Sequence, residues 1–158
     1  MVHAYYSTVV GREAWKPLAE QFEHGADVGI RGRGATPEEA FAGAAAALSS
    51  LWASDPSSVL PEVEAGVGCE AADLERLLVA FLDELIFLFA TRRFLFARLD
   101  VRIEASPGAP VRLAGWGAGE RYDATRHEST VEPKGATLTA LRVARENGSW
   151  VAQCVVDV

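Results

Sequence analysis

At residues 74–89 the chain reads LERLLVAFLDELIFLF, and its apolar residues repeat at the spacing of an α-helix. Asp73 and Glu75 are acidic residues near the start of this helix, where they suit the positive end of the helix dipole. The apolar face comprises Leu74, Leu77, Leu78, Phe81, Leu82, Leu85, Leu88 and Phe89. A face this broad predicts a helix at the centre of the core.

The segment before this helix predicts a strand that leads directly into another helix. Residues 28–34 begin with alternating apolar and polar side chains, as in a half-buried strand, and end at a glycine. Thr36, Pro37 and Glu39 then supply an N-cap, a first helical residue and the acidic member of a capping box. Apolar residues continue at helical spacing over residues 41–52. The pattern predicts one amphipathic helix packed against a sheet.

The rest of the chain predicts strands. Residues 59–69 alternate weakly around Pro61, which favours an edge strand. Further strands are predicted at residues 94–103, 110–117, 134–145 and 149–158. Asn147-Gly148 joins the last two and is a strong signal for a β-hairpin. Two main helices among such strands predict an α+β fold, a two-layer sandwich with a largely antiparallel sheet in a single domain.

Composition and charge narrow the class of protein. The 158 residues are 49% hydrophobic and carry a net charge of -7. These values fit one domain with a sizeable core, and they disfavour non-specific binding to nucleic acid. Cys69 and Cys154 lie far apart in apolar contexts, which predicts buried, reduced thiols. The N-terminus lacks the pattern of a signal peptide, and Asp83 and Glu84 interrupt the longest apolar run, so we expect a cytoplasmic protein.

Two aspartates far apart in the sequence are candidate metal ligands. His24 and Asp27 fall at the start of the first predicted strand, where a turn can direct both side chains toward one pocket. Asp157 interrupts the apolar run of the last strand, and a carboxylate there needs compensation. A hard cation such as calcium or magnesium could supply it, with the carbonyl or terminal carboxylate of Val158 nearby. The alternatives are a capping aspartate, a hydrogen-bonded histidine and a solvated chain end.

A second polar cluster follows a glycine-rich stretch. Its members are Tyr122, Asp123, His127 and Glu128. The glycines at residues 115–119 lack the strand-to-helix turn and the Lys-Ser/Thr pair of a phosphate-binding loop, so the sequence argues against a nucleotide cradle. The alternative for the cluster is an ordinary exposed loop.

Several separated segments resemble the archease family. The resemblance covers residues 22–158, whereas residues 1–21 show no clean period and are assigned to an N-terminal extension of unknown role. The matching segments are Phe22-Glu23-His24, Ala26-Asp27-Val28-Gly29, Thr36-Pro37-Glu38-Glu39-Ala40-Phe41, Leu77-Leu78-Val79-Ala80-Phe81-Leu82-Asp83-Glu84-Leu85, Phe94-Leu95-Phe96, Tyr122-Asp123 with His127, Glu132 with Lys134, and Val155-Val156-Asp157-Val158. Their order along the chain indicates an archease-like domain.

The resemblance implies an α+β sandwich that holds a divalent metal, for which we expect calcium, through Asp27, Asp157 and the carbonyl of Val158. It also implies a non-enzymatic role: the protein would promote guanylylation and turnover of a GTP-dependent RNA ligase. That ligase joins 3′-phosphate or 2′,3′-cyclic-phosphate ends to 5′-hydroxyl ends in tRNA splicing or RNA repair. Contact with RNA would be indirect. The candidate supporting polar residues are His24, Asp123, His127 and Lys134.

Two positions depart from the family pattern, and two other functions stay open. Gly25 replaces a small hydroxyl residue, and Thr137-Leu138-Thr139 replaces Thr-Tyr-His, so contacts of that histidine are missing here. A metal-dependent hydrolase would use His24, His127 or Glu128 as its general base. A chaperone-like module would hold another protein on an exposed apolar patch.

Overall fold

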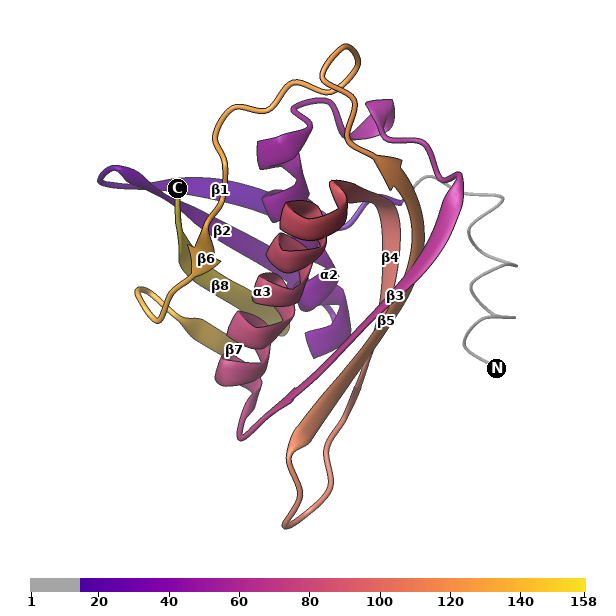
Figure 1. The fold of residues 1–158 in the computed structure, drawn as a ribbon. Helices are drawn as coiled ribbons and strands as arrows, with labels where there is room; N and C mark the ends of the chain where they lie inside the picture. Colours follow the sequence, from indigo (N-terminus) through magenta and orange to yellow (C-terminus); the bar gives the residue numbers. More distant parts are fainter. Residues whose placement is uncertain (1–14) are drawn as a thin grey trace.

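A computed structural model of the chain describes residues 15–158 (Figure 1). In chain order its elements are β1 (Leu18–His24), β2 (Asp27–Gly34), α2 (Pro37–Trp52), the 3-10 helix η1 (Pro56–Ser58), β3 (Val63–Ala71), α3 (Leu74–Arg92), β4 (Phe94–Glu104), β5 (Val111–Arg121), β6 (Gly135–Ala136), β7 (Arg142–Glu146) and β8 (Ser149–Asp157). The strand pairings among these elements are antiparallel.

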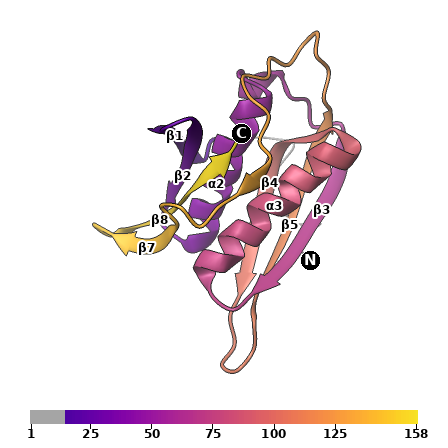
Figure 2. The ribbon, with the colours of Figure 1, turned by 60° about the vertical axis from the view of Figure 1, so that its left-hand side comes forward.

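The strands form two sheets. In sheet A the order is β1-β2-β8, and both β6 and β7 pair with β8; in sheet B the order is β3-β5-β4. Figures 1 and 2 show α2 and α3 between the sheets, and each helix contacts strands of both. The expected α+β fold with antiparallel sheets and two main helices is confirmed. Because the strands divide between two sheets, the helices form a layer in the middle of the sandwich.

Local hydrogen bonds set the ends of both helices. Thr36 caps α2, since its side-chain oxygen accepts a bond of 3.2 Å from the Glu39 N–H. Asp73 caps α3 in the same way, with a bond of 2.8 Å from the Arg76 N–H. At its other end α3 stops at Arg93, which adopts the left-handed conformation with φ 54°. These caps satisfy backbone groups that a helix end leaves open, and both predicted helix starts are confirmed.

Two glycines let α2 approach the strands of sheet A. A Cβ atom placed on Gly32 would lie 2.0 Å from the carbonyl oxygen of Ala40 and 2.2 Å from the amide nitrogen of Ala44. A Cβ atom on Gly43 would lie 2.3 Å from the carbonyl oxygen of Leu18. Backbone therefore packs on backbone here, a contact that any side chain at either position would prevent.

The core is formed where the two helices meet the inner faces of the sheets. Phe41 of α2 and Phe81 of α3 are fully buried, with ring centroids 5.9 Å apart. Trp52 stacks on Phe89 at a centroid distance of 4.5 Å. Other large, fully buried side chains are Ile30, Leu48, Leu51, Leu77, Leu78, Leu82, Leu95, Leu99 and Val151. The apolar face read from residues 74–89 is thus the centre of the core.

The strand predictions are wrong at two places. Residues 59–62 are not part of β3, which begins at Val63, although β3 is an edge strand as expected. Residues 134–145 are not one strand but two, β6 and β7, because the chain turns between them and Ala140 adopts a positive φ of 54°. Thr137 and Thr139 both hydrogen-bond to the backbone of Val155, and residues 138–140 between the two strands form a turn beside β8.

Strand β1 was not predicted. Its residues are mostly exposed on both sides, so no apolar period marks it in the sequence. It pairs with β2 along its whole length and places residues 18–21, which the sequence assigned to the extension, in sheet A.

The hairpin signal and the burial of Cys154 agree with expectation, whereas Cys69, which was also expected to be buried, is not fully buried. Asn147 and Gly148 adopt φ values of 52° and 83° and connect β7 to β8, as a two-residue turn requires. Cys69 and Cys154 are both free thiols, Cys154 buried and Cys69 half-buried. Burial raises the pKa of Cys154 to about 12, which keeps this thiol protonated at neutral pH. Within residues 15–158, neither helix has the length and apolar character needed to span a membrane.

Candidate metal site and a buried polar network

The register of sheet A brings Asp27 and Asp157 together. Val28 of β2 lies opposite Val156 of β8, so the next residue outward on each strand is an aspartate. The N–H of Val158 donates a 3.3 Å hydrogen bond to Asp27 Oδ1. Figures 1 and 2 show the end of β8 at the same end of sheet A as the β1–β2 turn. Two carboxylates that are 130 positions apart in the chain are therefore neighbours.

Two of the supporting residues lie at this same place. His24 is opposite Asp27 across the β1–β2 hairpin, and its side chain is exposed. The N–H of Lys134 donates a 2.8 Å bond to the Asp157 carbonyl, which fixes Lys134 beside the aspartates. Gly25 forms the turn with φ 62°, a conformation that glycine adopts without strain and a hydroxyl residue would not.

The donor set fits a hard cation only with help from backbone and water. Asp27 is half-buried and Asp157 is exposed, so the pair faces solvent at the sheet end. Among residues 15–158 no group of three or more His, Cys, Asp or Glu side chains is arranged to hold a metal ion. Calcium takes six to eight oxygen ligands and accepts carbonyls and waters beside carboxylates. Asp27 and Asp157 with the main chain of Val158 beside them offer oxygen ligands of the types that calcium binds, and water would have to complete the set.

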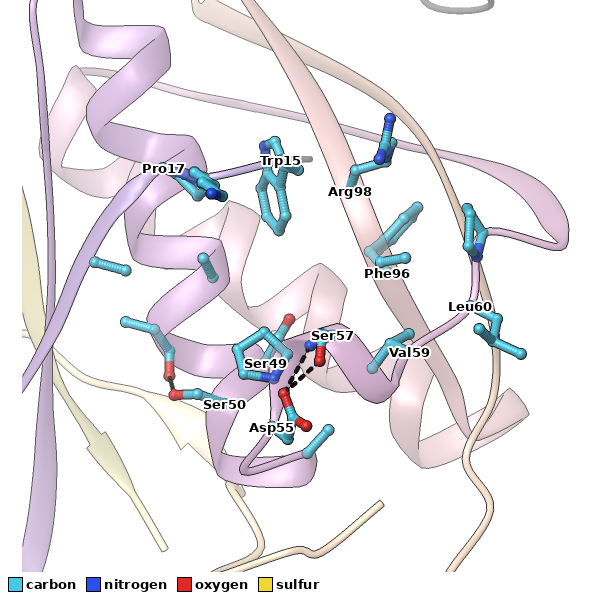
Figure 3. Close-up of a pocket in the computed structure, with 18 of the residues that line it drawn as sticks. Trp15, Pro17, Ser49, Ser50, Asp55, Ser57, Val59, Leu60, Phe96 and Arg98 are labelled. Carbon is cyan, nitrogen blue, oxygen red and sulfur yellow. Dashed lines mark hydrogen bonds between the residues drawn. The ribbon is translucent and has the colours of Figure 1, made fainter. Parts of the chain in front are cut away.

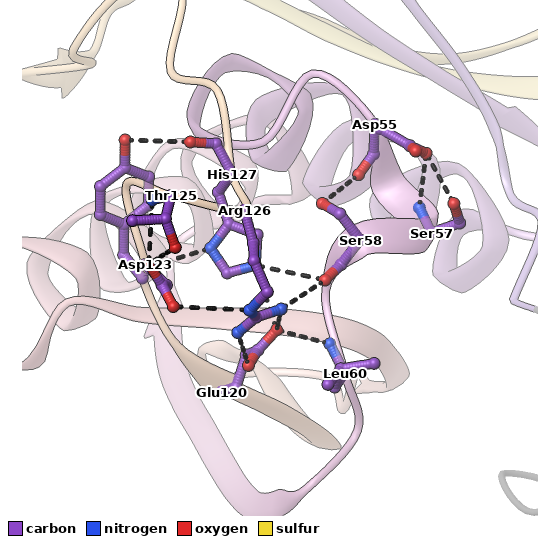
Figure 4. A network of polar contacts seen from close by, with 10 residues as sticks. Asp55, Ser57, Ser58, Leu60, Glu120, Asp123, Thr125, Arg126 and His127 are labelled. Carbon is purple, nitrogen blue, oxygen red and sulfur yellow. Dashed lines mark hydrogen bonds and ion pairs between the residues drawn. The ribbon is translucent and has the colours of Figure 1, made fainter.

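The other two supporting residues belong to a separate network (Figure 4). His127 is buried, and its Nδ1 accepts a 2.9 Å bond from the Asp123 N–H. Its Nε2 lies 3.0 Å from Glu120 Oε2 and 3.3 Å from the Ser58 carbonyl oxygen. Because Nδ1 is an acceptor, the ring is neutral and Nε2 carries the hydrogen. His127 thus ties the loop after β5 to the segment before β3.

Glu120 is the centre of this network. Its carboxylate binds Arg126 through both oxygens, and it also accepts a 2.8 Å bond from the Leu60 N–H. The Arg126 guanidinium holds the pKa of the Glu120 carboxyl below 4.5, since these bonds favour the charged form. The Asp123 carboxylate caps the same loop by accepting bonds from the N–H and hydroxyl of Thr125.

The sequence did not point to Glu120, Arg126 or Ser58. A single sequence does not show that Glu120, near the end of a glycine-rich strand, is only 7% exposed. Nor does it show that Ser58 lies beside His127, 69 positions later in the chain. The sequence left open whether the residues after the 115–119 stretch form a polar cluster or an ordinary exposed loop; in the structure His127 of this loop is buried and hydrogen-bonded, whereas Thr125 and Glu128 are exposed.

The match to known proteins covers nearly the whole described chain: residues 20–158 fit the model of the Archease protein family. The chain belongs to the archease family. Protein archease of Pyrococcus furiosus is 38% identical over 140 residues, which cover 88% of this chain and 97% of that protein. Protein archease of Methanopyrus kandleri is also 38% identical over 140 residues, with 88% and 98% covered.

Two solved structures agree with the archease fold. The solution structure of protein 1598 from Methanobacterium thermoautotrophicum superposes with a TM-score of 0.76 at 30% identity, and covers 89% of this chain and 99% of that one. The crystal structure of an archease from Thermotoga maritima, described as a possible chaperone, has a TM-score of 0.52 at 15% identity over 88% and 96% of the chains. The second likeness shows the fold alone.

In this archease the Glu120 network should make stability depend on pH. Because the folded-state pKa of Glu120 is lowered, its contribution is present above the ordinary value of 4.5 and is lost as pH falls through the lowered pKa. At pH 7, Glu120→Gln should lower the free energy of unfolding by about 2 kcal/mol, the value of hydrogen bonds to a charged group. Urea denaturation of both proteins across acid pH should show the difference shrinking. A difference that stays constant down to the acid limit would contradict this assignment.

Proposed function

We propose that this archease is an accessory protein of a GTP-dependent RNA ligase, and that Asp27, Asp157 and Val158 bind calcium in support of that role. The observation that supports the proposal is the register of β2 and β8, in which Val28 pairs with Val156, so that Asp27 and Asp157 follow on adjacent strands at the same end of sheet A. Adjacent carboxylates repel each other, and a divalent cation offsets that repulsion. When bound, the ion would supply a positive charge that orders both aspartates.

Backbone N–H groups hold the residues at this end of sheet A in place. Val158 N–H holds one oxygen of Asp27, and Lys134 N–H holds the backbone next to Asp157. The first bond positions the Asp27 carboxylate through one of its two oxygens, and the second holds the backbone that carries Asp157. The site stands at a sheet end on a protein of net charge -7, an electrostatic character that suits a partner pocket filled with metal ions and nucleotide. This partner is the ligase that joins 3′-phosphate or 2′,3′-cyclic-phosphate ends to 5′-hydroxyl ends, in a cytoplasmic setting.

The alternative functions have less support. A hydrolase that used His127 as its base would need a free ring nitrogen, but both nitrogens lie against protein atoms. A chaperone-like module would need a continuous apolar patch. The large exposed apolar side chains of the described residues are Leu18, Leu60, Val63, Phe87 and Leu138. They sit on β1, the loop before β3, β3, α3 and the turn between β6 and β7.

The first part of the test measures calcium binding by isothermal titration calorimetry. Loss of even an outer-sphere partner of a metal ligand costs about 10- to 100-fold in affinity, so Asp27→Asn and Asp157→Asn should each weaken binding by at least about 100-fold. Glu104→Gln is the matched control because it removes one exposed carboxylate from sheet B. If both aspartate variants bind calcium as wild type does, the metal site is wrong.

The second part follows covalent guanylylation of the purified ligase with GTP. Wild-type protein should raise the yield, Glu104→Gln should match it, and the two aspartate variants should bring it to the level of ligase alone. Should folded, calcium-loaded wild type give no increase, the ligase role is wrong whatever the calorimetry shows.

A further inference from the structure

Asp83 interrupts the apolar run of α3 and has a partner on sheet A. Its Oδ1 accepts a 2.8 Å hydrogen bond from the Ala136 N–H. Asp83 is exposed, so this bond lies at the surface between the helix and β6. A Cβ atom placed on Gly135 would lie 3.9 Å from the same oxygen, so the carboxylate is close to the backbone of both residues of β6. Asp83 therefore joins the central helix of the core to a strand of only two residues.

Strand β6 in turn holds the end of β8 that carries Asp157. Gly135 lies opposite Asp157 in the register of the two strands. The N–H of Lys134 donates a 2.8 Å bond to the Asp157 carbonyl oxygen, and the N–H of Thr137 donates a 3.0 Å bond to the Val155 carbonyl oxygen. The 134–137 segment is thus bonded to β8 on one side and to Asp83 on the other.

The candidate metal site depends on the order of this segment. Strand β8 ends at Asp157, and the end of a strand opens more readily than its middle. The N–H of Val158, just beyond the strand, bonds to Asp27 Oδ1 and so links this end to the second aspartate. Hydrogen bonds therefore connect α3, through β6, to the backbone of Asp157 and to the side chain of Asp27.

Two similar contacts between a helix and a strand of sheet A lie away from the site. Glu75 of α3 accepts a 3.4 Å bond from the Val143 N–H of β7. On β1, the Gln21 side chain donates a 2.7 Å bond to the Ser50 hydroxyl of α2. Gln21 and Ser50 also line a cavity of about 820 Å³ between β1, α2 and β4 (Figure 3). Neither contact involves β6, so both provide matched controls for Asp83.

We infer that Asp83 is a positioning residue for the candidate metal site, because it fixes β6 and, through β6, the backbone of Asp157 and Val158. Among residues 15–158 Asp83 is not grouped with other acidic side chains as a metal ligand, so it acts through the backbone. The effect on backbone order stands on the hydrogen bonds alone. The effect on calcium binding rests on the proposed function.

Hydrogen exchange of backbone amides, followed by NMR in the full-length protein, tests the effect on order. Asp83→Ala removes a charged acceptor, so exchange at Lys134 and Val158 should become at least about tenfold faster. Neither of these amides bonds to Asp83 itself, so the change would show that order passes through β6. Alanine is the better helix former and Asp83 is exposed, so the variant should fold, as circular dichroism would verify.

Asp83→Asn separates the hydrogen bond from the charge. Asparagine keeps a side-chain oxygen that can accept the Ala136 N–H but loses the same charge as alanine does. This variant should recover most of the protection at Lys134 and Val158. Glu75→Ala and Ser50→Ala should leave exchange at both amides as it is in wild type.

Calcium titration by calorimetry tests the effect on the site. Asp83→Ala should weaken calcium binding by about tenfold or more, the usual cost of losing a residue that orients a metal ligand. Asp83→Asn, Glu75→Ala and Ser50→Ala should bind calcium nearly as wild type does.

The outcomes separate this inference from the proposed function. Unchanged exchange at Lys134 and Val158 in Asp83→Ala overturns the inference, whatever the calcium titration shows. Faster exchange with unchanged calcium affinity overturns the positioning role at the metal site, and equal effects of alanine and asparagine overturn the role of the hydrogen bond. If wild type binds no calcium, the proposed metal site is wrong, and the exchange rates alone decide whether Asp83 orders this end of β8.

Discussion

Phe81→Ala should lower the free energy of unfolding by about 4 kcal/mol, the usual cost of removing a fully buried aromatic side chain. Phe81 is 0% exposed at the centre of α3, and its ring packs against Phe41 of α2. The loss combines the lost burial with a cavity that the two sheets cannot close. Urea denaturation at neutral pH, with the slope compared to that of wild type, measures it.

Phe87→Ala is the control in the same helix. Its side chain is 60% exposed, so truncation should change the stability by less than about 1 kcal/mol. Equal losses of stability at both positions would mean that the side of α3 that carries Phe81 is not the side that faces the core.

Gly32→Ala should cost about 3 kcal/mol, at the upper end of what overpacking costs. The new methyl group would meet the backbone of α2 at Ala40 and Ala44, and a helix backbone cannot yield as a flexible side chain does. The helix would have to move away from β2 and reopen the core behind it. Thermal and urea unfolding should both report the loss.

The matched change is Gly68→Ala on β3. There the closest atom to an added Cβ is the Leu113 carbonyl oxygen at 3.6 Å, an ordinary contact. We expect a stability within about 0.5 kcal/mol of wild type, or a slight gain, because alanine loses less backbone freedom on folding than glycine. If both glycine substitutions were tolerated, the close approach of α2 to β2 would be wrong.

The sequence predicted the elements whose ends are set by hydrogen bonds between residues close together in the chain. Thr36 and Asp73 each provide a helix cap within three residues of the bond they make, and Asn147-Gly148 carries its turn in two residues. Strand β1 could not be predicted in this way, because it is held in place by pairing with β2 and its residues show no apolar period. The division of the strands into two sheets is also a property of long-range packing.

The candidate site was likewise predictable where a signal lies within one segment, and not where it depends on contacts between distant residues. Asp157 was noticeable because a carboxylate broke an apolar strand, and β-sheet register then placed it beside Asp27. His127 and Asp123 were grouped with the aspartates, but they form their bonds with Glu120 and Arg126 in a separate network. A polar residue in a loop carries no sign of whether it faces solvent or a buried partner, so that distinction needed the structure.

Strand β8 occupies an inner position of sheet A, between β2 and the pair β6 and β7, although it comes last of all the strands. Sheet B and α3 come from one continuous stretch, residues 63–121, so their contacts close short loops. Strand β2 pairs with β8, which lies more than 110 residues later in the chain, so this contact closes a much longer loop. Folding order follows: the 63–121 unit can assemble early, and β8 completes sheet A late. Until it does, β2 has an unpaired edge that can pair with the strand of another chain.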